Sequence, residues 1–173
     1  MRIRTYTFVT LDGYVSTPDG RRIQLLLPGF PGAGAYGLPE FLASCQAVVM
    51  GRTTFLPALE ASQWPWTQPV FVLTSSALPE GTPDHVRTAP SADELINVMK
   101  SAGVSGDVHL VEGPRTVQAF RAIGALAEIG LVIIPRIQGG GVPLAPAGVE
   151  PLPLTLRSTR TFPDGVIESW YVP

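Results

Sequence analysis

Cysteine, histidine and charge are all scarce in this 173-residue sequence. Its single cysteine, Cys45, excludes an internal disulfide, and its two histidines leave little to build a metal site from, so we expect none. Charged residues make up 15% of the chain and the net charge is −2, without basic runs. Charge therefore gives no argument for a nucleic-acid or membrane partner.

Long apolar runs are also missing. No uninterrupted apolar stretch reaches the roughly 18 to 20 residues that span a bilayer. Met1 leads directly into a strand-like segment, without a positively flanked apolar leader. We therefore expect a cytoplasmic protein without a membrane partner.

Apolar residues, glycine and proline are abundant. Apolar residues make up 45% of the chain, which excludes the disordered class and predicts a well-filled core. The eighteen glycines and eighteen prolines are spread between apolar segments, so many short elements joined by turns are expected. The length favours one domain, residues 1–173.

Strand-like and helix-like segments alternate along the chain. Strands are predicted at 2–9, 46–51, 69–75, 107–113 and 128–137, and helices at 38–45, 52–59, 91–103 and 116–126. The glycine-rich segment 28–37 is expected to hold no regular structure. Two alternating strands about Pro163-Asp164-Gly165 predict a terminal hairpin.

Two of the predicted helices have clear signals. Ser91 is a cap with Glu94 three residues on, and Gly103 closes that helix. The helix at 116–126 is expected to bury Val117, Phe120, Ile123 and Leu126. Because parallel strands need crossover connections, the pattern predicts a three-layer α/β/α domain. Its sheet would be mixed and mostly parallel, with an antiparallel C-terminal hairpin.

Three predicted strands are each followed by a segment rich in glycine, arginine or residues with a hydroxyl group. GRTT begins at Gly51, TSS at Thr74 and EGPRT at Glu112. Ligands of such sheets bind beyond the carboxyl ends of parallel strands, and helix N-termini there attract phosphate. The alternative is that Thr53 or Thr54 caps a helix and Arg52 lies in solvent. GGG at 139–141 is a fourth candidate, or a flexible turn.

Several other sites are excluded by their missing motifs. The spacing fits neither a P-loop nor the dinucleotide-binding fingerprint, and neither HExxH nor CxxC occurs. Ser75 and Ser76 have no GxSxG context, so a serine hydrolase is unsupported. A phosphate-bearing ligand at the strand ends is the remaining interpretation.

Six segments in this order resemble the dihydrofolate reductase superfamily. They are FVTLDGYVS, VVMGRTTF, VFVLTSS, VHLVEGPRTVQAF, LVIIPRIQGGGVPL and TFPDGVIESWYV. The likeness covers about residues 2–172 and is greatest for the reductase domain of bifunctional riboflavin biosynthesis proteins and its stand-alone relatives. It implies an NADPH-dependent oxidoreductase, resembling 5-amino-6-(5-phosphoribosylamino)uracil reductase or dihydrofolate reductase. The hydride acceptor would be a small nitrogen heterocycle: a pyrimidine, a pterin or a dihydrofolate-like substrate.

The resemblance also assigns cofactor-binding residues in four segments. They are Thr10, Leu11 and Gly13; Gly51, Arg52, Thr53 and Thr54; Thr74, Ser75 and Ser76; and Glu112, Gly113, Pro114, Arg115 and Thr116. By position, Arg52 with Ser75 and Ser76 would hold the 2′-phosphate, and the segment from Gly113 would receive the pyrophosphate. Glu112 stands where the family has a glycine, which places a carboxylate close to that pyrophosphate.

Two acids are candidates for catalysis. Glu40 is the only acid on the short helix before the GRTT strand, and it is also a residue type favoured by a helix dipole in a first turn. Asp12 is the second candidate, although Asp-Gly is equally a turn signal.

The alternative function is a nucleotide-binding module without turnover. Trp64, Trp66 and Trp170, with the hairpin, are either core residues or a homodimer patch.

Overall fold

The computed structural model describes residues 1–30, 32–61, 64, 66–111 and 113–173. Its backbone contacts divide into two compact units. The first unit comprises Met1–Thr5 and Ser44–Leu126, and the second comprises Tyr6–Ala43 and Ala127–Pro173. The single domain 1–173 stays a prediction.

A mixed sheet confirms the predicted fold class. Among the described residues, eight strands are ordered β5-β4-β3-β6-β1-β7-β10-β9. The pairs β1–β6, β6–β3, β3–β4 and β4–β5 are parallel, whereas β7–β10 and β10–β9 are antiparallel. The chain is therefore an α/β protein whose sheet is mostly parallel and ends in the antiparallel C-terminal pair.

The first unit alternates strands and helices. Its strands are β3 (Cys45–Gly51), β4 (Val70–Leu73), β5 (Val86–Ala89), β6 (Asp107–Leu110) and the start of β1 (Ile3–Thr10), and its helices are α2 (Arg52–Leu59), α3 (Ala92–Ser101) and α4 (Pro114–Ala122). Val48, Met50, Val70 and Val72 form one buried cluster with Phe55 of α2. Because side chains alternate across a strand, Val49 and Phe71 fill the opposite face. This explains the continuous apolar runs of β3 and β4.

Three details of the first unit differ from the sequence prediction. β5 was missed, because Arg87 and Thr88 are exposed and the strand lacks an apolar run. α4 ends at Ala122 and not at 126, since Gly124 turns the chain with φ +68°. Ile123 is consequently 38% exposed and Leu126 opens a strand. The Ser91 cap is confirmed, with Ser91 Oγ accepting from Glu94 N at 3.3 Å.

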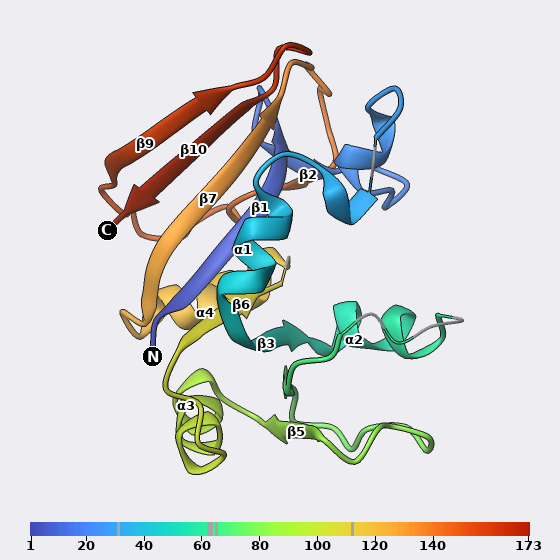
Figure 1. Cartoon of the computed structure of the whole chain (residues 1–173), viewed down its shortest axis with the longest axis vertical. Coiled ribbons are helices and arrows are strands. Elements are labelled where there is room, and N and C mark those ends of the chain that lie inside the picture. Colours follow the sequence, from blue (N-terminus) through green and yellow to red (C-terminus); the bar gives the residue numbers. More distant parts are fainter. Residues whose placement is uncertain (31, 62–63, 65, 112) are drawn as a thin grey trace. The chain divides into compact units, whose positions relative to one another are not determined.

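The second unit is mostly β structure. Its elements are the rest of β1, β2 (Tyr14–Ser16), η1 (Ile23–Leu26), η2 (Gly32–Gly34), α1 (Leu38–Ser44), β7 (Leu126–Ile134), β8 (Val142–Pro143), β9 (Thr155–Thr161) and β10 (Ile167–Val172). Figure 1 shows the β9–β10 hairpin beside β7. The 3-10 turn η2 corrects the expectation that 28–37 holds no regular structure.

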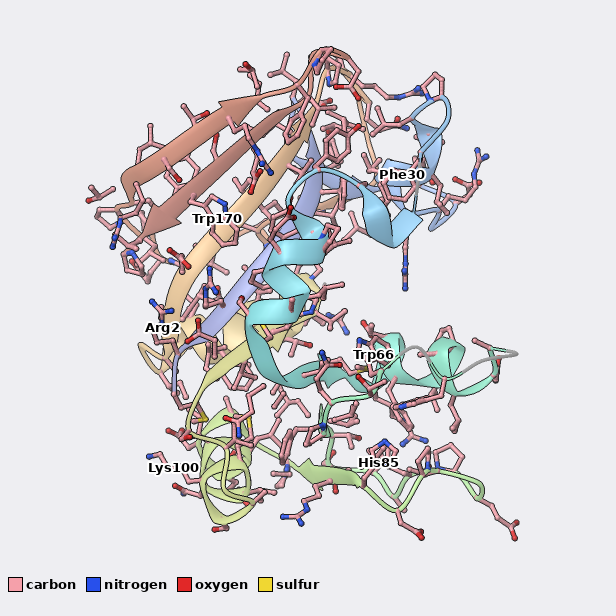
Figure 2. The ribbon with its side chains drawn as sticks, in the orientation of Figure 1. Arg2, Phe30, Trp66, His85, Lys100 and Trp170 are labelled. Atoms are coloured by element: carbon pink, nitrogen blue, oxygen red, sulfur yellow. The ribbon has the colours of Figure 1, made fainter. Side chains whose placement is uncertain are left out.

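Aromatic side chains and one buried carboxylate fill the second unit. Tyr6 stacks on Phe41 with ring centroids 5.2 Å apart. Trp170, which is labelled in Figure 2, packs against both rings. The buried Glu168 accepts hydrogen bonds from Trp170 Nε1 at 2.7 Å and from Arg160 Nη2 at 2.6 Å. Trp170 is therefore a packing residue of this unit, and Trp64 and Trp66 pack against the buried cluster of the first unit. The homodimer stays a prediction.

Candidate functional site

The ends of three parallel strands build one rim of the first unit. β6 and β4 are the two neighbours of β3, and all three run parallel, so their carboxyl ends lie at the same edge. At that edge β3 ends at Gly51 and α2 begins at Arg52, while Gly113 precedes α4. The predicted convergence of these segments is thus seen within one unit.

The two glycine junctions are closely packed. A Cβ atom placed on Gly51 would lie 2.5 Å from Thr116 Oγ1, so a larger residue requires Thr116 to move. Gly113 adopts φ +149°, and a Cβ there would lie 3.4 Å from Thr116 Oγ1 and 3.8 Å from Thr54 Oγ1. The β3–α2 and β6–α4 junctions therefore meet with backbone and hydroxyl groups at the contact.

Both helices begin without a side-chain cap. Gly51 precedes α2 and Gly113 precedes α4, and neither helix has an acidic residue in its first turn. The first backbone N–H groups of an α-helix have no partner inside the helix and carry partial positive charge. Two such N-termini suit a phosphate. This corrects the alternative in which Thr53 or Thr54 caps α2.

Arg52 is held against the segment that follows β4. Its Nη1 donates to Ala77 O at 2.8 Å, and the side chain is half-buried. In the same segment Ser76 N donates to Thr74 Oγ1 at 3.1 Å, while Ser75 and Ser76 are exposed. A guanidinium and two hydroxyls thus belong to neighbouring segments. This combination suits a phosphate group, whose oxygens can accept two parallel hydrogen bonds from a guanidinium.

The remaining assigned residues of the first unit differ in exposure. Thr53 and Arg115 are exposed, and Thr116 is buried. Pro114 occupies the first turn of α4, where a missing N–H costs nothing. Glu112, whose carboxylate was expected close to a pyrophosphate, lies outside the described residues.

The carboxylate of Asp12, in the second unit, is hydrogen-bonded within the chain. Its carboxylate accepts from Thr10 Oγ1 at 2.6 Å, from Gly139 N at 2.7 Å and from Gln138 N at 3.0 Å. The hydroxyl of Thr10, followed by these backbone N–H groups, lowers the pKa of Asp12 to about 2. An acid that is ionised at neutral pH and fully hydrogen-bonded suits an anchor better than a proton donor.

Glu40 and the GGG segment have different surroundings. Glu40 is exposed in the first turn of α1, where the helix dipole favours a carboxylate. Gly141 has φ +133°, and a Cβ there would collide with the Ser16 carbonyl oxygen. Gly141 is therefore packed closely against β2, whereas a Cβ on Gly139 would meet nothing within 4 Å. A ligand site and a flexible turn both stay predictions for the segment 139–141.

Sequence reasoning missed Gln138 and Glu168. The backbone of Gln138 joins the Asp12 anchor, and nothing in its side-chain pattern signals this. Glu168 lies in β10 between Ile167 and Ser169, and these neighbours give no signal that the carboxylate is buried.

The described residues provide neither a group of metal ligands nor a helix that could span a membrane. No group of three or more His, Cys, Asp or Glu side chains in the described part of the chain is arranged to hold a metal ion. None of its helices has the length and apolarity needed to cross a bilayer.

No family model matches the chain. The uncharacterized protein YwjB of Bacillus subtilis (strain 168) is 25% identical over 164 residues, which cover 93% of this chain and 92% of YwjB. The relationship therefore extends over nearly the whole length of both proteins.

Solved structures share the fold. A protein ascribed to riboflavin biosynthesis from Shewanella sp. PV-4 has a TM-score of 0.84 and 25% identity, over 99% of this chain and 98% of that one. The diaminohydroxyphosphoribosylaminopyrimidine deaminase/5-amino-6-(5-phosphoribosylamino)uracil reductase of Thermotoga maritima has a TM-score of 0.74 and 16% identity, over 99% of this chain and 56% of that one. These neighbours confirm the resemblance and the fold class that the sequence predicted.

Proposed function

We propose that this chain, which has the fold of the dihydrofolate reductase superfamily, is an NADPH-dependent reductase acting on a small nitrogen heterocycle. The acceptor would be a pyrimidine, a pterin or a dihydrofolate-like molecule. The observation that carries the proposal is the meeting of two uncapped helix N-termini, at Gly51 and Gly113, on one rim of the first unit. Bound NADPH would supply the hydride.

The rim residues have distinct tasks in this proposal. Backbone N–H groups at the starts of α2 and α4, with Thr54 and Thr116, would bind the pyrophosphate, because they present positive dipole ends and hydroxyls. Arg52, with Ser75 and Ser76, would bind the 2′-phosphate through charge-assisted hydrogen bonds. The roles that the resemblance gives to Thr10, Leu11 and Gly13, along the nicotinamide and the substrate, are part of the proposal.

A nucleotide-binding module without turnover is the second candidate. The state of the two acids favours it: Asp12 is occupied by three donors, and Glu40 is exposed. Under the reductase proposal neither acid needs to transfer a proton, because hydride transfer depends mainly on placing the donor against the acceptor. A solvent water would then supply the proton.

Turnover separates these two functions. We would record NADPH oxidation with a panel of pterins and aminopyrimidines, and measure NADPH-dependent thermal stabilisation in parallel. Stabilisation with acceptor-dependent oxidation supports the reductase. Stabilisation without oxidation of any acceptor supports the binding module. If NADPH is not oxidised and does not stabilise the chain, both functions are contradicted.

A homodimer is the oligomeric state we propose. The β9–β10 hairpin exposes Leu154, Leu156 and Ile167, which a second copy of the chain would cover. Light scattering tests this, and a monomer at micromolar concentration would contradict it.

A further inference from the structure

Two large aliphatic side chains of the second unit are exposed on neighbouring backbone segments. Leu11 is 65% exposed and Ile137 is 68% exposed. Leu11 N donates to Arg136 O at 2.9 Å, and Gln138 N donates to the Asp12 carboxylate at 3.0 Å. Since these bonds link residues 11–12 to residues 136–138, Leu11 and Ile137 lie in adjacent segments between two fixed links.

Hydrogen bonds join the backbone segments that carry Leu11 and Ile137. Asp12 also accepts from Gly139 N at 2.7 Å, and Leu144 N donates to Gly13 O at 2.8 Å. Gly141 abuts the Ser16 carbonyl, and β2 pairs with β8 in the same region. The two side chains are therefore presented on a framework that needs little ordering when a ligand binds, which favours affinity.

We propose that Leu11 and Ile137 form an apolar shelf for the planar ring of the heterocyclic acceptor, and that Asp12 is the positioning residue of this shelf. The inference rests on the proposed function, and it adds Ile137 and the part played by Asp12. Both side chains would cover one face of the ring, because aliphatic groups and ring faces gain by leaving water.

The size and the polar neighbours of the shelf favour a small ring over a protein partner. Two side chains provide far less than the roughly 800 Å² per partner that a stable protein interface buries. Arg136, whose Nε donates to Gln138 Oε1 at 2.9 Å, directly precedes Ile137 in the chain. Its terminal N–H groups are suitable donors for the polar edge of a ring.

Ile137→Ala tests the shelf by direct binding. Fluorescence titration with a pterin, and competition by an aminopyrimidine, gives the dissociation constant without turnover. We expect the constant to rise about tenfold in the variant, as for other groups that line an apolar pocket. The matched control is Ile123→Ala, which removes a 38% exposed isoleucine at the end of α4 and should leave the constant unchanged.

Asp12→Asn tests the positioning role through a double-mutant cycle. The amide keeps the shape of Asp12 but weakens its acceptance from Thr10, Gln138 and Gly139. If Asp12 acts through the shelf, the effects of Asp12→Asn and Ile137→Ala on the pterin constant are non-additive. Additive effects would overturn the positioning role.

The shelf and the reductase proposal fail in different ways. Equal pterin affinity in wild type, Ile137→Ala and Ile123→Ala overturns the shelf, and so does a wild-type chain that binds neither heterocycle. NADPH titration of the same samples reports the proposed function separately. A chain that binds pterin through Ile137 but does not bind NADPH keeps the shelf and loses the reductase.

Discussion

Gly51 and Thr116 approach so closely that a Cβ on the glycine would stand 2.5 Å from the threonine Oγ1. Gly51 ends β3 and Thr116 lies in the first turns of α4, so this contact joins two helix starts of the first unit. The contact explains why the chain has a glycine at the end of β3: only the missing side chain lets the second helix start come this near.

Gly51→Ala should loosen this contact. Forcing a methyl group into it is expected to cost about 1 to 3 kcal/mol of unfolding free energy, as overpacking does, and to weaken NADPH binding. Urea unfolding and NADPH titration measure the two effects.

Thr116→Ala supplies the matched comparison for Gly51→Ala. Removing the hydroxyl should restore most of the stability lost in the glycine variant, because the two sites share the contact. A double variant as unstable as the sum of its single variants would contradict the contact.

Glu168→Ala should destabilise the chain. The buried carboxylate accepts from Trp170 Nε1 and pairs with Arg160, and its removal leaves the indole N–H without this partner. A loss of about 1 to 3 kcal/mol is expected in urea unfolding, which is the range for leaving a buried polar group without its partner. Asp19→Asn is the control, because its pair with Arg21 is exposed on both sides and should contribute nothing measurable. Equal losses in both variants would disprove the assignment.

Stability should fall as the pH drops below about 6.5, because of His109. Burial lowers the pKa of His109 from 6.5 to about 4, so the unfolded chain takes up the proton first. The contribution is complete above pH 6.5 and is lost as the pH falls toward 4. Between about pH 7 and about pH 5 the expected loss is about 2 kcal/mol. His109→Gln should remove this part of the pH dependence; an unchanged slope would refute it.

The fold could be predicted from the sequence because its signals are local. The apolar runs of β3 and β4, the Ser91 cap and the turn at Gly165 each specify their element within a few residues. β5 was missed because an exposed strand such as Val86–Ala89 depends on pairing with β4, which a local pattern does not carry.

The site was predictable only in part. Segments that end parallel strands could be expected at one rim, and the closeness of Gly51 and Gly113 to Thr116 agrees with this. The partners of Asp12 could not be predicted, because they are backbone N–H groups 126 and 127 residues away in the chain. A carboxylate in an Asp-Gly turn looks the same in sequence whether it binds a ligand or its own protein.

The most direct test of the account is a comparison of NADPH and NADH binding in wild type and Arg52→Ala. The guanidinium is held at the segment after β4, and we propose that it binds the 2′-phosphate that only NADPH carries. Arg52→Ala should therefore weaken NADPH at least tenfold, the size expected for a charged hydrogen bond, and leave NADH nearly unchanged. Arg87→Ala, which removes an exposed arginine of β5, should affect neither cofactor. Equal weakening of both cofactors in Arg52→Ala, or a wild-type chain that binds neither, would contradict the account.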